Sequence, residues 1–231
     1  MNQKLLFDII IPSWNQSKLA IQCLQSIKKH SHSYRVIFVD NASKKEEFDK
    51  IYKVLETMPY ILIKNEKNEG FVKATNKGLE TSTAPYIVFM NNDTEAVPKW
   101  LDELRIPLDK DRRIGLVGPL TTTKNSWQGK YKIGQKGVEV LRKNMMLAFF
   151  CTMMRRDVYE KIGNLDEDFG VGFGDDDMYC WRAHQAGYRL ALTKNIVIPH
   201  HHRSTFKKIY TNTEIKNMQE EAIRILRKKR G

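Results

Sequence analysis

The chain has 231 residues, of which 41% are hydrophobic and 29% charged. This composition excludes collagen-like, low-complexity and wholly disordered chains and suffices for a substantial core. The longest uncharged apolar-rich run, residues 145–154, is about half of what a membrane crossing needs, and the polar N-terminus is unlike a secretory signal. Three widely spaced cysteines without a CxxC pair favour a reducing compartment. We therefore expect a soluble, cytoplasmic protein.

The charge is strongly positive. There are 39 Lys and Arg against 27 Asp and Glu, a net charge of +12. Residues 203–231 hold nine basic and three acidic side chains, so half of the excess, +6, lies in about an eighth of the chain. Such an end is usually only solvated, and it is alternatively a contact for nucleic acid or an anionic membrane.

Strand and helix patterns alternate through the first half of the chain. In chain order, we predict a strand over 5–12, a helix over 16–30, a strand over 35–40, a helix over 44–57, a strand over 60–64, a helix over 71–81, a strand over 85–90, a helix over 98–108 and a strand over 114–118. Because the strands are almost continuously apolar, this alternation predicts a parallel sheet covered by helices on both faces.

The second half is less regular. We expect a polar, mobile loop over 121–136, a buried strand over 145–154, a helix over 175–186 ended by Gly187, and a strand over 189–198. Open α/β sheets bind ligands beyond the carboxyl ends of their strands. The candidate site residues therefore follow the predicted strands.

Polar residues do gather there. Ser13, Asp40 and the run Asn91-Asn92-Asp93-Thr94 each follow an apolar strand. A carboxylate in the last run can hold a divalent cation against a diphosphate, since Mg²⁺ and Mn²⁺ take few protein ligands. An Asx turn is the alternative explanation for this run.

Two further clusters, one of aspartates and one of histidines, are candidates for the site. Residues 175–177 are three consecutive aspartates at a helix start, where a helix N-terminus or a cation offsets their repulsion. Residues 200–202 are three histidines after a strand, and alternation places His200 and His202 on one face. Imidazole suits Mn²⁺ better than Mg²⁺, so the pairing of His with carboxylates favours manganese. Helix capping and a solvated strand end are the simpler explanations.

Several common motifs are missing. The sequence has no GxxxxGK[ST], no GxGxxG after the first strand, no HExxH and no GxSxG. P-loop hydrolysis and a Rossmann dinucleotide site are therefore not expected.

Taken together, the motifs resemble the family 2 glycosyltransferases of the GT-A fold, which use nucleotide-diphosphate sugars with inversion. The resemblance covers about residues 7–206. It rests on seven segments in order: 11–15, 39–43, 68–78, 91–94, 151–156, 165–169 and 174–188. It implies a Rossmann-like, mostly parallel sheet flanked by helices, with a less regular acceptor-binding half. It also implies one domain over 1–206, divided near residue 120 into a nucleotide-sugar half and an acceptor half, and a basic helical tail over 207–231.

The resemblance also implies roles for individual residues. The nucleotide-sugar site would comprise Pro12, Ser13, Trp14, Asp40, Asn68, Gly70, Lys73, Asn76, Asn92 and Asp93. Asp93 would bind the metal, with His200 or His202 completing its coordination shell. Asp176 would be the general base, with Asp175 as the alternative. The sequence departs from the pattern at Asn91, where the first carboxylate of the usual DxD is an amide and a weaker ligand.

The chemistry agrees with these roles, because inversion needs one base on the acceptor hydroxyl and stabilisation of the departing diphosphate. We expect an acceptor that is a glycan, a lipid-linked or a protein-linked hydroxyl, and peripheral contact of the tail with an anionic membrane. Two alternatives remain open. A nucleic-acid-binding α/β protein would explain the charge but not the acids at the strand ends, and we expect no nucleic-acid partner. A sugar nucleotidyltransferase would need a Gly-rich loop after the first strand.

Overall fold

One eight-stranded sheet forms the centre of the protein in a computed structural model that describes residues 4–124, 126–131, 134–170, 172–201 and 211–231. The strand order is β3-β2-β1-β4-β7-β5-β8-β6. The strands are β1 (Phe7–Ser13), β2 (Tyr34–Asp40), β3 (Tyr60–Lys64), β4 (Tyr86–Met90), β5 (Ile114–Thr121), β6 (Val138–Val140), β7 (Cys151–Arg155) and β8 (Arg189–Ile198). β1 to β4 pair in parallel with one another, as do β5 and β8, whereas β7 is antiparallel to β4 and β5, and β6 to β8. The expected α/β fold with a mostly parallel sheet is confirmed.

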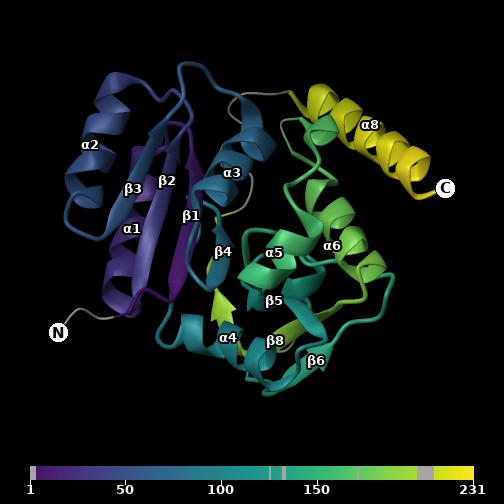
Figure 1. Cartoon of the computed structure of the whole chain (residues 1–231). Coiled ribbons are helices and arrows are strands. Elements are labelled where there is room, and N and C mark those ends of the chain that lie inside the picture. The colour runs from purple at the N-terminus through teal and green to yellow at the C-terminus, as the bar shows by residue number, and fades with distance from the viewer. Residues whose placement is uncertain (1–3, 125, 132–133, 171, 202–210) are drawn as a thin grey trace.

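Helices cover both faces of this sheet (Figure 1). The core residues of α1, α2 and α4 pack on one face, and those of α3, α5, α6 and α8 on the other. The helices are α1 (Ser17–His30), α2 (Lys45–Leu55), α3 (Gly70–Thr81), α4 (Trp100–Lys110), α5 (Arg156–Ile162), α6 (Asp175–Gln185) and α8 (Asn212–Arg230), with short 3-10 turns η1 (Trp127–Gly129) and η2 (Glu167–Phe169).

The two faces follow from the alternation of side chains along each strand. In β1, Ile9 and Ile11 belong to the cluster under α1, while Ile10 lies under α3 on the opposite face. A Cβ added at Gly78 of α3 would lie 2.4 Å from Cγ2 of Ile10. The missing side chain at Gly78 therefore lets α3 lie directly on the sheet.

The segment before β7 differs from its prediction. Only residues 151–155 form a strand, and residues 145–150 have no strand neighbour. The backbone N–H of Leu147 donates to Sγ of Cys180 at 3.3 Å, and that of Ala148 donates to Oε1 of Gln128 at 2.8 Å. Side chains thus accept hydrogen bonds from the backbone of this buried segment, so the segment does not need to pair with a strand although it is apolar. The predicted strand over 145–154 is therefore wrong in its first six residues.

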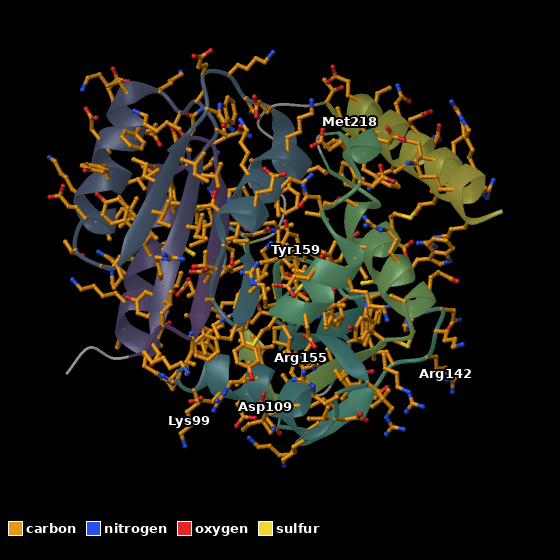
Figure 2. All side chains as sticks on the ribbon, in the orientation of Figure 1. Lys99, Asp109, Arg142, Arg155, Tyr159 and Met218 are labelled. Carbon is orange, nitrogen blue, oxygen red and sulfur yellow. The ribbon has the colours of Figure 1, made fainter. Side chains whose placement is uncertain are left out.

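One buried cation, at the junction of β7 and α5, holds the neighbouring loops in place. The guanidinium of Arg155, labelled in Figure 2, donates to the backbone oxygens of Leu108, Arg112 and Ile114 at 2.8–3.0 Å. This arginine joins the end of α4 to the start of β5. Its charge is met by Asp157 Oδ1 at 3.0 Å.

The basic end of the chain is not a free tail. Helix α8, which holds the labelled Met218, lies beside α6 and far from β3 (Figures 1 and 2). Its apolar residues Ala222, Ile225 and Leu226 pack on the domain, and Ile215 is also buried. Within the described residues, no helix is both long enough and apolar enough to span a bilayer.

Candidate active site

The ends of β1, β2 and β4 are joined into one surface by hydrogen bonds between their loops. The amide of Asn92 donates to Oγ of Ser13 at 2.9 Å. The backbone N–H of Asn41 donates to the Ser13 carbonyl at 2.8 Å. The structure therefore brings together Ser13, Asp40 and the loop 91–94, as expected for the carboxyl edge of a parallel sheet.

The backbone of these loops is strained. Asn15, Gln16 and Ala42 have φ angles of 53°, 57° and 62°, in the left-handed region that disfavours residues with a Cβ. Two hydrogen bonds hold this conformation, from the Asn15 N–H to Oγ of Ser43 at 2.7 Å and from the Lys44 N–H to Oδ1 of Asn15 at 2.8 Å. Strained, well-held loops of this kind are typical of binding sites.

Asn41 fixes the loop before α3, a role that the sequence did not reveal. Its amide nitrogen donates to Oδ1 of Asn68 at 2.8 Å and to the Gly70 carbonyl at 3.1 Å. Its amide oxygen accepts from Nδ2 of Asn65 and from the N–H of Glu69. Gly70 opens α3 with φ +85°, which explains why a glycine is required there. An asparagine among turn residues offers no sequence signal that would distinguish this clamp from an ordinary cap.

The remaining residues expected at the nucleotide lie at the same edge in different environments. Pro12 and Trp14 are half-buried and Asp40 is buried. The side chain of Asp40 has one described hydrogen bond, from the Ser43 N–H to Oδ1 at 3.3 Å. A carboxylate in this position is able to accept from a base or a ribose.

Asn76 and Lys73 of α3 contact the acceptor half. Oδ1 of Asn76 accepts from the Leu165 N–H at 2.9 Å, and its Nδ2 donates to the Leu165 carbonyl at 3.0 Å. Lys73 is exposed, with Nζ 3.9 Å from Oε2 of Glu167. The Asn76 amide is thus engaged in joining α3 to the loop before η2, and its expected place near the ribose-diphosphate stays a prediction.

Asp93 and His200 form the best candidate for a metal site. Nε2 of His200 lies 3.2 Å from Oδ1 of Asp93, and both side chains are more than nine-tenths buried. An antiparallel bridge between Thr94 and His200 sets this approach, and the ring of Phe150 stacks on the imidazole at 5.0 Å between centroids.

The side chain of Asn91 lies next to this pair. Its Nδ2 lies 3.5 Å from Nε2 of His200, and its Oδ1 is buried without a hydrogen-bond partner among the described residues. A carboxylate, an imidazole and an amide oxygen are suitable ligands for Mn²⁺, so these residues fit a divalent cation. The described residues include no cluster of three His, Cys, Asp or Glu side chains suited to a metal, so further ligands would come from the substrate or water.

The other two histidines differ in position. His201 is exposed, and its Nε2 lies 2.9 Å from Oε1 of Glu95. His202 lies outside the described residues. Of the two expected ligands, the structure places His200 beside Asp93.

The three aspartates occupy the first turn of α6. The end of α6 leads through Gly187 to Arg189, which pairs with Ile114 at the start of β5. The N-terminus of α6 therefore points toward the edge at which the strands end, the same edge as Asp93.

The environment differs between these carboxyl groups. Asp175 is 4% exposed, and burial raises its pKa to about 6. The side chain of Asp176 is only partly buried. Desolvation, together with the charge of the adjacent Asp175, raises the pKa of Asp176 well above the usual range. Asp176 is the more accessible of the pair, as a base that meets a substrate hydroxyl must be.

Comparison with known proteins identifies the family. The sequence model of the family described as Glycosyl transferase family 2 matches residues 8–163, more than half of the chain. Among curated relatives, glycosyltransferase AglE of Haloferax volcanii is 26% identical over 205 residues, which are 82% of this chain and 64% of that protein. An uncharacterised glycosyltransferase of Haemophilus influenzae is 25% identical over 113 residues, 48% of this chain and 37% of that protein. The chain thus spans only part of the length of both relatives.

Solved structures agree on the fold. The mannosyltransferase PcManGT from Pyrobaculum calidifontis, in complex with GDP-Man and Mn²⁺, superimposes with a TM-score of 0.70 at 17% identity, over 86% of this chain and 57% of that one. TarS of S. aureus in complex with UDP-GlcNAc gives a TM-score of 0.73 at 13% identity, over 95% and 65%. The fold is that of the GT-A glycosyltransferases, and the match of the family model shows that the protein belongs to glycosyl transferase family 2.

Proposed function

We propose that this protein transfers a sugar, with inversion, from a nucleotide-diphosphate sugar to a hydroxyl group of a glycan or a lipid- or protein-linked acceptor. The observation that carries the proposal is the buried Asp93–His200 pair, with the Asn91 side chain beside it, at the sheet edge toward which the acidic turn of α6 points. The complexes of PcManGT with GDP-Man and of TarS with UDP-GlcNAc support a nucleotide-sugar donor.

The donor would lie across the ends of β1, β2 and β4. Asp40 would accept from the nucleoside, and the strained loops at Trp14 and Ala42 would shape its pocket. Asp93 and His200, with Asn91, would hold a divalent cation, Mn²⁺ rather than Mg²⁺, and a cation bound there would neutralise charge on the departing diphosphate.

Asp176 would act on the other substrate. As the acceptor hydroxyl attacks the anomeric carbon, Asp176 takes its proton, and the bond from that carbon to the diphosphate oxygen breaks. Asp175 is too buried for direct contact with an acceptor and raises the basicity of Asp176 through repulsion. A glycan acceptor is in keeping with the similarity to chondroitin synthase of Escherichia coli, which is 27% identical over 127 residues, 52% of this chain and 18% of that protein.

Metal binding provides the first test. Asp93→Ala removes the carboxylate, so we expect Mn²⁺ affinity, measured by calorimetry or electron paramagnetic resonance, to fall below detection and donor turnover to be nearly abolished. His200→Ala should weaken binding by at least about 10–100-fold, the range observed when a residue that only supports a metal ligand is lost.

His201→Ala is the matched control, because His201 follows His200 but is exposed and contacts Glu95. It should bind Mn²⁺ like the wild type. Full activity in excess EDTA, or equal losses in both histidine variants, would contradict the proposed metal site.

A further inference from the structure

Helix α8 covers the acidic part of the acceptor half. Six carboxylates lie in two short clusters, residues 166–168 at η2 and residues 175–177 at the start of α6. We call these two clusters together the acidic segment. Like charges this close repel one another, and neutralising them requires cations from elsewhere in the fold.

The last turn of α8 supplies such cations. Nζ of Lys229 lies 2.6 Å from Oδ2 of Asp166 and also 2.6 Å from Oδ2 of Asp168. Nη2 of Arg230 lies 2.9 Å from Oδ1 of Asp177. Two of the four basic residues that end α8 therefore contact both clusters of the acidic segment.

Apolar packing holds the helix in the same place. Ala222 is 7% exposed, and a Cβ added at Gly174 would lie 3.3 Å from the Cβ of Ala222 and 3.0 Å from Phe169. Gly174 also has φ +81°, so a larger residue there would be both strained and crowded. The turn that leads into Asp175 is thus formed against α8.

We propose that Arg230 is a positioning residue for glycosyl transfer. With Lys229, it holds α8 on the acidic segment, and it thereby fixes the first turn of α6 from which Asp176 reaches the acceptor. This inference rests on the proposed function, because it assumes that Asp176 is the general base.

The proposal has a specific electrostatic consequence. The groups that face this turn are Asp175, Asp176 and Asp177 of α6 itself, Asp166 and Asp168 of η2, and Lys229 and Arg230 of α8. Removing one of the two cations leaves the carboxylates less compensated, so their ionisation shifts to higher pH. A merely structural role for α8 predicts lower stability instead, without a shifted pH profile.

The test compares Arg230→Ala with Lys228→Ala. Lys228 precedes the pair on the same helix and is exposed, and within the described residues it forms no ion pair and acts on Asp168 only more weakly than Lys229 does. Both variants therefore lose one charge from the same turn. We expect the kcat profile of Arg230→Ala to move up by about one pH unit, a tenfold loss below the midpoint. The donor KM and Mn²⁺ affinity should not change, and Arg230→Lys should restore much of the rate.

Hydrogen exchange gives a readout independent of activity. Peptides from residues 163–178 should exchange faster in Arg230→Ala, and not in Lys228→Ala, in the full chain under native conditions. Equal exchange and equal pH profiles in the two variants would overturn the proposal. If the wild type transfers no sugar, the proposed function fails, whereas faster exchange of this segment would still show that Arg230 positions it.

Discussion

Side chains of the same type at this site differ in how far their hydrogen-bonding capacity is used. Both side-chain atoms of Asn76 are engaged by Leu165, and both atoms of Asn41 by the loop before α3. Asn91, by contrast, keeps a buried oxygen without a partner among the described residues. A buried polar atom in this state is unfavourable unless something binds it. At the residue scale, this difference separates structural asparagines from a candidate ligand.

The general base is the residue whose role is most directly tested. Asp176→Asn keeps the shape of the side chain and an oxygen that can accept the Asp177 N–H, which donates to Asp176 Oδ1 at 2.8 Å. It removes the basic function, and loss of a general base lowers the rate by about 10²–10⁴-fold. We expect transfer to fall by this factor in a rapid-quench assay while nucleotide-sugar affinity is nearly unchanged.

Asp177→Asn should have a milder effect than Asp176→Asn, since Asp177 contacts Arg230 and is not the group proposed to take the proton. Wild-type transfer by Asp176→Asn with an inactive Asp175→Asn would assign the base to Asp175. Retained activity in both variants would exclude this acidic turn as the base.

The buried carboxyl of Asp175 predicts a dependence of stability on pH. Its pKa rises from 3.8 to about 6 on folding, so the folded state holds this proton more tightly than the unfolded state does. The contribution to stability is present below about pH 4 and is lost as the pH rises to about 6. Asp175→Asn removes this loss, and we expect it to raise the free energy of unfolding at pH 7 by about 3 kcal/mol.

Urea unfolding of both proteins at pH 4 and pH 7 measures this effect. At pH 4 the two should be nearly equally stable, because the wild-type carboxyl is largely protonated. A difference that is the same at both pH values would mean that the substitution acts through packing and not through ionisation.

The elements of the first half were predictable from the sequence, and those of the second half only in part. Apolar runs closed by turn residues, such as those ending at Ser13 and Asp40, determine β1 and β2 locally, and the structure confirms them. The segment 145–150 is equally apolar, but its partners are the side chains of Gln128 and Cys180, which are remote in sequence. No local pattern reveals such partners. The same limit hid the docking of α8 and the clamp made by Asn41.

Gln128 is the side chain on which this irregular element depends. It is completely buried within η1, and its amide joins the Pro119 carbonyl at 2.7 Å to the Ala148 N–H at 2.8 Å. Gln128→Ala leaves both backbone groups buried and unpaired, which typically costs about 1–3 kcal/mol for each group. We expect the free energy of unfolding, measured by chemical denaturation, to fall by about 2–4 kcal/mol.

Gln135→Ala is the control for this measurement, because Gln135 is exposed on the same connection. It should change stability by less than about 0.5 kcal/mol. Equal stability of the two variants would show that Gln128 does not hold residues 145–150 in place.

At the scale of the whole molecule, the docking of α8 determines which of its basic residues contact the domain and which remain exposed to solvent. Ile225 and Leu226 pack on the domain and Ile215 is buried, so none of them is available for insertion into a bilayer while α8 is docked. Lys229 and Arg230 contact the acidic segment. The outward face keeps Arg224, Arg227 and Lys228, together with Ile223, which is 47% exposed. Any contact with an anionic membrane would thus use this cationic face, with α8 still folded on the domain.

Membrane binding by this cationic face should be electrostatic. Each Lys or Arg near an anionic surface contributes about 1 kcal/mol, so reversing Arg227 and Lys228 together should weaken binding to phosphatidylserine-containing liposomes at least about tenfold in co-sedimentation. The control reverses Lys29 and Lys53, which are exposed on α1 and α2 and produce the same change in net charge. If both double variants bind equally, net charge alone attracts the protein. If the wild type does not bind at physiological salt, the cationic face of α8 serves no membrane contact, and a lipid-linked acceptor would have to reach the site from solution.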